Sequence, residues 1–147
     1  ADLIELGAEP ARPYQHLYNT DPPEKLTLFA RAFQGMELLA DRRLAFVLVR
    51  KTDITDCGAT HEDLDELVQA PMKLKGSEVS SLLYEAADGF IKLSLRSKER
   101  VNVNAVCRLF GGGGHLLASG AKLEGSLESA TDKVKAALLA QLEKDLS

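Results

Sequence analysis

The sequence predicts an α/β fold in which a mixed β-sheet packs against helices and is preceded by a helical linker. Residues 44–49 form a continuous apolar run of strand length, which is typical of a strand in the middle of a sheet. Residues 90–97 alternate apolar and polar side chains, as does a strand with one buried face. Residues 126–142 repeat apolar side chains at helical spacing. Strands and helices mixed along one chain in this way indicate an α/β domain.

The first forty residues are expected to be helical. Residues 1–7 and 13–19 read as short helical segments. Thr20 and the prolines that follow it are a helix start signal, and an apolar stripe follows them. We therefore interpret residues 1–40 as a helical linker and residues 41–147 as one domain. A chain that begins inside a helix also suggests a fragment of a longer protein.

Each further element of the domain has a local signal for its start or its end. Capping residues precede helices, Gly and Pro follow them, and an Asp-Gly pair is typical of a hairpin turn. In chain order we expect a central strand 44–49, a turn or helical turn 52–56 closed by Gly58, a helix 61–69 capped by Thr60 and stopped by Pro71, a strand 76–87, an Asp88-Gly89 turn, a strand 90–97, a helix from Asn102 or Asn104 to Phe110, a strand 121–124 and a helix after Ser126.

Composition limits the class of protein. The chain has 147 residues, of which 45% are hydrophobic and 27% charged, and this is enough for one domain with a sizeable core. No apolar run approaches the ~20 residues of a membrane span, so we expect no membrane partner. Cys57 and Cys107 form no Cys-x-x-Cys pair. Two isolated cysteines are typical of free buried thiols in a reducing compartment, so the expected location is cytoplasmic.

The distribution of charge is more informative than its total. The net charge of −4 argues against a nonspecific binder of duplex DNA. Residues 92–115 carry five Lys or Arg and one acid, whereas residues 53–66 carry six acids and no Lys or Arg. The basic stretch leads into a glycine run, an arrangement that favours a small anionic ligand. The alternative is that these are scattered surface charges.

Four consecutive glycines, Gly111–Gly114, precede His115 and form the most informative motif of the chain. Such a run costs backbone entropy, which folded domains accept where backbone approaches a partner closely or several amides face one anion. We therefore predict a phosphate-binding loop. A flexible linker is the alternative, but the segments on both sides have the composition of ordered structure.

The predicted site combines this loop with the end of the strand 90–97. Arg96 is expected on the polar face of that strand, where its guanidinium can contact a phosphate through two donors. Ser97 can donate its hydroxyl to the same group. The opposite side of the phosphate is expected to be closed by the amides of Gly112, Gly113 and Gly114 and by the ring of His115. This arrangement needs no metal ligand from the chain.

Other motifs indicate weaker alternatives. The glycine run is neither a Walker A motif nor a Rossmann G-x-G-x-x-G fingerprint. The histidines and cysteines lack zinc-ligand spacing, and the acids of residues 53–66 lack the order of a calcium loop. His16 and His61 are interpreted as surface or partly packed residues. Tyr84 and Phe110 can stack on a base or belong to the core, and both readings stay open.

Several segments match one known signature. They are residues 57–60 (Cys-Gly-Ala-Thr), 94–97 (Ser-Leu-Arg-Ser), 101–103 (Val-Asn-Val), 111–115 (four Gly and His) and 118–120 (Ala-Ser-Gly). Together they resemble the DHH-associated C-terminal domain, the substrate-binding half of DHH phosphoesterases. The bacterial oligoribonuclease/pAp-phosphatase (nanoRNase) branch is the most similar. The resemblance covers about residues 44–120, and residues 1–40 resemble the end of the catalytic domain and its linker.

The resemblance implies a two-domain enzyme. Its N-terminal DHH domain would bind manganese, and a metal-bound water would attack the phosphoester. Its C-terminal domain would grip the phosphate and nucleotide of a short oligonucleotide or a nucleotide 3′-phosphate. In that scheme Arg96 and His115 contact the substrate phosphate, with Ser97 and the amides of residues 112–114 beside them. The implied partners are the substrate and the absent DHH domain, with a homodimer as one option.

The chain also departs from the family. It contains no Asp-His-His triplet, and Asn102 and Cys57 stand where Asp and Thr are common. We therefore expect the chain alone to be inactive, with no catalytic residue, no metal ligand and no cofactor of its own. Three alternatives stay open: a non-catalytic RNA-binding module, a cyclic-dinucleotide phosphodiesterase domain, and a glycine loop with a purely structural role.

Overall fold

The structure, a computed structural model of the chain, describes residues 21–147. The elements in chain order are α3 (Pro23–Gln34), β1 (Glu37–Leu39), β2 (Leu44–Val49), α4 (Lys51–Cys57), the 3₁₀ helix η1 (His61–Leu64), α5 (Asp65–Gln69), the 3₁₀ helix η2 (Ala70–Lys73), β3 (Val79–Glu85), β4 (Ile91–Ser97), α6 (Val103–Leu109), β5 (Gly113–His115), β6 (Ala118–Leu123) and α7 (Leu127–Leu146). The helical segments expected at residues 1–7 and 13–19 lie outside the described residues. None of the described helices is long and apolar enough to cross a membrane.

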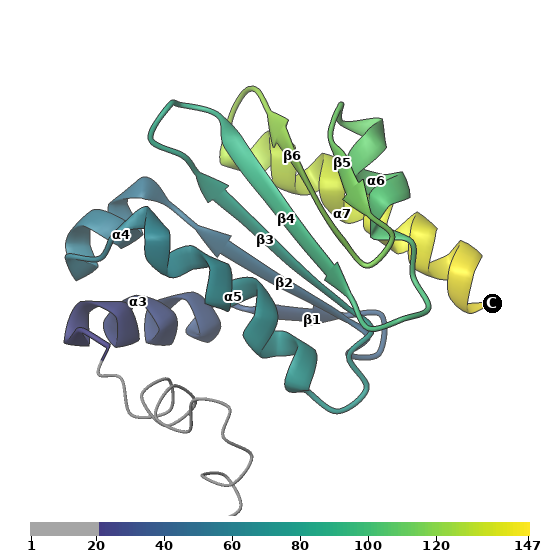
Figure 1. The fold of residues 1–147 in the computed structure, drawn as a ribbon, viewed down its shortest axis with the longest axis horizontal. Coiled ribbons are helices and arrows are strands. Elements are labelled where there is room, and N and C mark those ends of the chain that lie inside the picture. The colour runs from purple at the N-terminus through teal and green to yellow at the C-terminus, as the bar shows by residue number, and fades with distance from the viewer. Residues whose placement is uncertain (1–20) are drawn as a thin grey trace, which may run out of the picture.

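Six strands form one mixed sheet in the order β1-β2-β3-β4-β6-β5 (Figure 1). β2 and β3 are parallel, and every other neighbouring pair is antiparallel. The predicted α/β class with a mixed sheet is therefore confirmed. The predicted hairpin is confirmed as well, because β3 pairs with β4 across a turn in which Gly89 has a φ of 90°.

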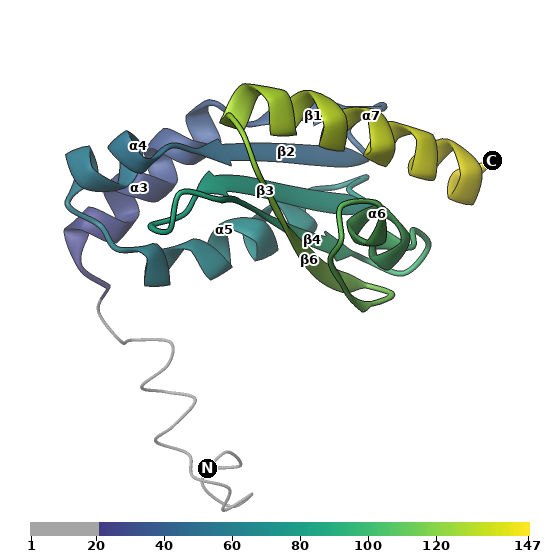
Figure 2. The same ribbon diagram turned by 90° about the horizontal axis from the view of Figure 1, so that it is seen from above.

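Helices cover the two faces of the sheet unequally. On one face α6 and α7 pack over a core that includes Leu93 and Leu95. On the other face α3, α4 and α5 pack over β2 and β3, in a second core around Leu28, Val47 and Leu82. Figures 1 and 2 show α5 and α7 on opposite sides of the sheet, and in Figure 1 no described helix lies in front of β4, β6 and β5. We call the α5-side surface of these three strands the open face.

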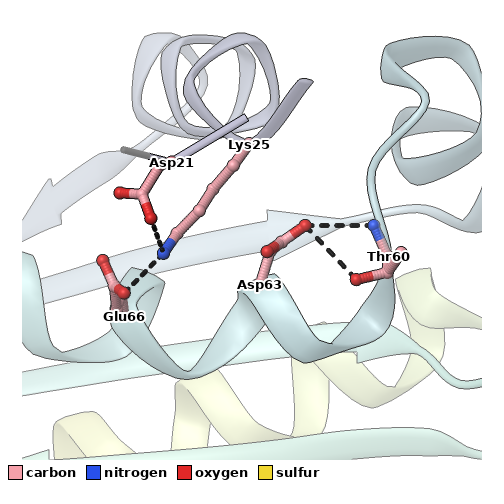
Figure 3. Close-up of polar contacts among 5 residues, drawn as sticks. All are labelled: Asp21, Lys25, Thr60, Asp63 and Glu66. Carbon is pink, nitrogen blue, oxygen red and sulfur yellow. Dashed lines mark hydrogen bonds and ion pairs between the residues drawn. The ribbon is translucent and has the colours of Figure 1, made fainter. Parts of the chain in front are cut away.

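A buried lysine anchors α3 to α5, beside the open face. Lys25 Nζ donates to Glu66 Oε1 at 2.6 Å and to Asp21 Oδ1 at 3.2 Å (Figure 3), and its side chain is 10% exposed. The hydrogen bond to Glu66 is the main reason that the pKa of Lys25 is raised.

Asp63 accepts a hydrogen bond from the Thr60 amide at 3.1 Å, which fixes the start of the helical segment where the sequence predicts it.

Two of the predicted helix starts are confirmed in their capping atoms. Asn102 Oδ1 accepts from the Ala105 amide at 3.0 Å, and Ser126 Oγ accepts from the Ser129 amide at 3.1 Å. The predicted helix 61–69 needs a correction, because it begins as 3₁₀ turn η1 before it becomes α5. Pro71 does not end the helical segment. It lies in the first turn of η2, where its missing N–H costs no hydrogen bond.

The strands of the glycine region differ from the prediction. Residues 113–115 form edge strand β5 instead of a loop, and β6 begins at Ala118, not at residue 121. β1 was not predicted at all. Glycine has a low intrinsic strand propensity. The pairing of β5 with β6 therefore comes from the tertiary structure and not from a local preference of Gly113 and Gly114. β1 is only three residues long, too short to show a period in sequence.

Candidate functional site

The polar face of β4 lies on the open face, as its alternation predicts. Along β4 the side chains alternate strictly between buried and half-buried. Leu93 and Leu95 enter the core under α6 and α7. Lys92, Ser94 and Arg96 point the other way and stay half-buried. On this side α5 approaches β4, but no described helix lies in front of β6 and β5, so the three half-buried polar side chains keep part of their surface open to a ligand.

The strand register brings Arg96 and His115 into one row. Arg96 lies opposite Ala118 of β6, and Ala118 lies opposite His115 of β5. Directly opposed residues of antiparallel strands point to the same face. Adjacent strands are about 4.8 Å apart, so the Cα atoms of Arg96 and His115 are separated by about 10 Å. A phosphate group between them can contact both side chains.

Arg96 is positioned for an anion. Its Nη1 donates to the Leu95 carbonyl oxygen at 2.8 Å, which orients the guanidinium while other donors stay free. Among the described residues no carboxylate lies within ion-pair distance of Arg96, in contrast to Arg100, which pairs with Glu78 at 2.8 Å. His115 is exposed. Arg96 and His115, the two side chains predicted to contact a phosphate, therefore both lie on the open face.

Ser97 takes a different place from the predicted one. Its side chain is buried, with an exposure of 7%, and it lies on the core face of β4. Ser97 Oγ accepts a hydrogen bond from the Val101 amide at 3.3 Å, and the Ser97 amide donates to the Leu117 carbonyl at 2.9 Å. The structure therefore does not bring the Ser97 hydroxyl beside Arg96. The period of two in a strand separates neighbours onto opposite faces, and Ser97 instead ties the end of β4 to the turn after His115.

The glycine run allows close packing of backbone against β6, and it presents few free amides to a ligand. The Gly112 amide donates to the Cys107 carbonyl at 2.9 Å, and the Gly114 amide donates to Asn104 Oδ1 at 2.9 Å. These two predicted donors already have partners within the chain. A Cβ on Gly112 would lie 2.1 Å from the Gly120 carbonyl oxygen. Gly113 stays on the open face in the row next to His115, paired with Gly120.

A hollow lies on the open face beside this row. Its volume is about 490 Å³, and it is lined by Tyr84, Lys92, Leu93, Ser94, Gly111, Gly112, Gly120, Ala121 and Lys122. The three glycines in this lining contribute only backbone atoms to it. A second hollow of about 260 Å³ shares Tyr84 and Lys92 with it. From the sequence alone, Tyr84 is only an open alternative for stacking on a base, and no local signal places Lys122 at the site.

The charges around these hollows are largely balanced. Lys122 Nζ pairs with Asp88 Oδ2 at 3.2 Å and lies 5.3 Å from the centre of the Phe90 ring. The Phe90 amide, which donates to Asp88, is the main cause of the lowered pKa of Asp88, and Lys122 adds to it. Burial raises the pKa of Tyr84, and the nearby carboxylates of Asp65 and Asp88 raise it further. Tyr84 is therefore a neutral phenol at physiological pH.

The part of the chain that the structure describes shows no cluster of metal-ligating side chains, and its two cysteines are buried. No group of three His, Cys, Asp or Glu side chains gathers there to hold a metal ion. Cys57 and Cys107 are free and buried, as predicted. Burial raises the pKa of the Cys107 thiol, which lies 3.1 Å from Ser119 Oγ. His61 Nε2 lies 3.2 Å from the Glu85 carbonyl oxygen, and His16 lies outside the described residues.

Known proteins share this domain. The family model described as the DHHA1 domain matches residues 45–144. The probable bifunctional oligoribonuclease and PAP phosphatase NrnA of Streptococcus mutans is 33% identical over 94 residues, which are 64% of this chain and 30% of that protein. The bifunctional oligoribonuclease and PAP phosphatase NrnA of Thermus thermophilus is 38% identical over 88 residues, which are 59% of this chain and 26% of that protein.

A solved structure shows the same arrangement of elements. The crystal structure of an exopolyphosphatase-related protein from Bacteroides fragilis superposes with a TM-score of 0.83 at 28% sequence identity. The match covers 93% of this chain and 40% of that protein. The chain thus spans less than half the length of each of these proteins. Because the family model matches most of the chain and the fold agrees, the chain belongs to the DHHA1 family, the companion of the DHH domain in DHH phosphoesterases.

Proposed function

We propose that this domain binds substrate phosphate for a DHH phosphoesterase that acts on short oligonucleotides or nucleotide 3′-phosphates. The row formed by Arg96 and His115 on the open face is the observation that carries the proposal. Arg96 has free guanidinium donors and no acid partner among the described residues, which suits a phosphate oxygen. The NrnA relatives, named as oligoribonucleases and PAP phosphatases, support this substrate class.

In the proposed whole protein the phosphoester chemistry takes place on the DHH domain. The described residues of this chain do not fit a metal site, because no three suitable side chains gather. Manganese would therefore be held by the DHH domain, and this chain would contribute binding and orientation of the substrate. The open face is the surface that would close over the cleft, with Arg96 and His115 directed to the phosphate.

Phosphate binding by this chain can be measured directly. We expect adenosine 3′,5′-bisphosphate (pAp) and a 5′-phosphorylated dinucleotide to shift the amide NMR signals of Arg96, Gly113 and His115 in a saturable way. The Arg96→Gln and His115→Ala variants should each weaken binding by ~1.5–3 kcal/mol, as for a charge-assisted hydrogen bond. That is a loss of about 10–150-fold in affinity.

A matched control removes a positive charge elsewhere. Lys133 is exposed on α7, which packs on the other side of the sheet. Lys133→Gln should bind both ligands as the unchanged chain does. Equal affinity in Arg96→Gln, His115→Ala and Lys133→Gln would contradict the proposed phosphate site.

A further inference from the structure

The hollow on the open face lies at a defined distance from the phosphate row. Tyr84 of β3, Lys92 of β4 and Lys122 of β6 stand opposite one another and form a second row across the sheet. Lys92 precedes Arg96 by four residues on the same face of β4. At about 3.3 Å per residue, the two rows are separated by about 13 Å. This separation is on the scale of a nucleotide.

The hollow is lined by the aromatic residue Tyr84 and by the backbone of glycines. Tyr84 is half-buried, packs against the core under α3, α4 and α5, and lines both neighbouring hollows. The His61 ring lies 6.1 Å from the Tyr84 ring, centre to centre, and helps to hold it. Gly112 and Gly120 form part of the floor and have no side chains that rise into the space. An aromatic face beside an open floor is the arrangement on which a nucleobase stacks.

The charge of the hollow does not suit a second phosphate. Lys122 is already paired with Asp88, at 3.2 Å. Asp65 and Asp88 both lie near enough to act on the Tyr84 hydroxyl. Lys92 makes no ion pair with any described residue, so two lysines and two carboxylates surround the hollow and leave no excess of positive charge. A neutral group with hydrogen-bond acceptors is therefore favoured over an anion.

We propose that this hollow receives the nucleobase of the ligand whose phosphate lies at Arg96 and His115. The base stacks on the Tyr84 ring, and the Lys92 ammonium donates to an acceptor atom on the edge of the base. The inference rests on the proposed phosphate site, and it adds a base-binding subsite to it. The domain would then grip one nucleotide at both ends, by its phosphate and by its base.

Removing the base from the ligand and the ring from the protein tests the proposal. The affinity of this chain is measured by calorimetry for pAp and for the abasic ribose 3,5-bisphosphate. The unchanged chain should bind pAp at least about fivefold more tightly, because stacking on an aromatic ring is worth that much per base. In Tyr84→Leu the two ligands should bind within about twofold of each other, as the stacking contribution is lost.

Two further variants distinguish a loss of stacking from a loss of folded structure. Tyr84→Phe keeps the ring and should keep the full preference for pAp. Lys92→Met removes the donor, leaves the strand intact and should reduce the preference in part. An amide NMR spectrum of each variant shows whether the sheet is unchanged.

Each result has one meaning. Equal binding of pAp and the abasic ligand by the unchanged chain would overturn the base subsite while leaving the phosphate site in place. A preference for pAp that persists in both Tyr84→Leu and Lys92→Met would overturn it as well. Loss of affinity for both ligands in Lys92→Met would identify the hollow as a phosphate subsite instead. No binding of either ligand to the unchanged chain would contradict the proposed function itself.

Discussion

Gly112 is the position at which a single methyl group should do most damage to the candidate site. A Cβ at Gly112 would lie 2.1 Å from the Gly120 carbonyl oxygen and 2.6 Å from the Ala121 Cβ. An ordinary carbon–oxygen contact is about 3.3 Å, so the chain before β5 and strand β6 would have to separate by more than 1 Å. Both obstacles belong to the backbone or to a Cβ, and no flexible side chain can move out of the way.

The cost of Gly112→Ala can be estimated from this geometry. Overpacking of a tight site costs about 1–3 kcal/mol. Separation of β5 from β6 would also weaken backbone hydrogen bonds, at about 1 kcal/mol each. We expect a loss of about 3 kcal/mol or more in the free energy of unfolding, from a total of roughly 5–15 kcal/mol for a domain.

Gly111→Ala is the matched control, one residue away in the same run. A Cβ at Gly111 would meet no atom within 4 Å, but Gly111 has a φ of 80°. Its cost is therefore only that of the left-handed conformation, roughly 1–2 kcal/mol. Urea unfolding of both variants measures the difference. Binding of pAp should also fall in Gly112→Ala, because β5 positions His115.

The reasoning fails if Gly112→Ala is no less stable than Gly111→Ala. In that case backbone conformation, and not the close approach of two strands, would be the reason for the glycine run. Unchanged stability together with local loss of amide protection in residues 113–115 would show that β5 detaches without unfolding the domain.

Two further predictions concern the helices that frame the site. Lys25→Met should lower the free energy of unfolding by about 1 kcal/mol, measured with urea at pH 7. The value is modest because the partner Glu66 is more than half exposed and solvent screens the pair. If Lys25→Met causes the same loss in a chain that already carries Glu66→Gln, the pairing is contradicted. The pKa of Asp145 is lowered in the folded state, mainly by the hydrogen bond from the backbone N–H of Asn102 and further by the one from the Gln141 side chain. The ionised Asp145 therefore stabilises the fold above the unfolded pKa of about 3.9, and this stabilisation disappears as the pH falls through the lower folded pKa. Asp145→Asn should therefore destabilise the domain at pH 7 but not near pH 2, and equal destabilisation at both values would refute this assignment.

Local patterns were sufficient for much of the fold. The continuous apolar run of β2 and the alternation of β4 predict buried strands because burial on one or both faces dictates their side chains. Asn102 and Ser126 start their helices because a short polar side chain satisfies an exposed amide of the first turn, whatever packs around it. Arg96 could be placed on the polar face of β4 for the same reason, since a period of two is a property of the strand alone.

Other features depend on contacts between distant segments. β5 forms because β6 offers a partner to glycines that have no strand preference of their own. Ser97 follows Arg96 in sequence but lies on the opposite face, where the turn around Val101 uses its hydroxyl. Tyr84 and Lys122 come from separate strands that only the register places beside Lys92.

The sequence by itself therefore determined the fold class, the polar face of β4, the free cysteines and the family resemblance, because these follow from local periodicity and from motifs of adjacent residues. The tertiary structure alone decided which predicted groups meet. It placed His115 in the row of Arg96, turned Ser97 into the core, and gave Gly112 its role in close packing. These relations are set by the order and register of the strands, and pairing between segments far apart in the chain leaves no periodic trace in any one of them.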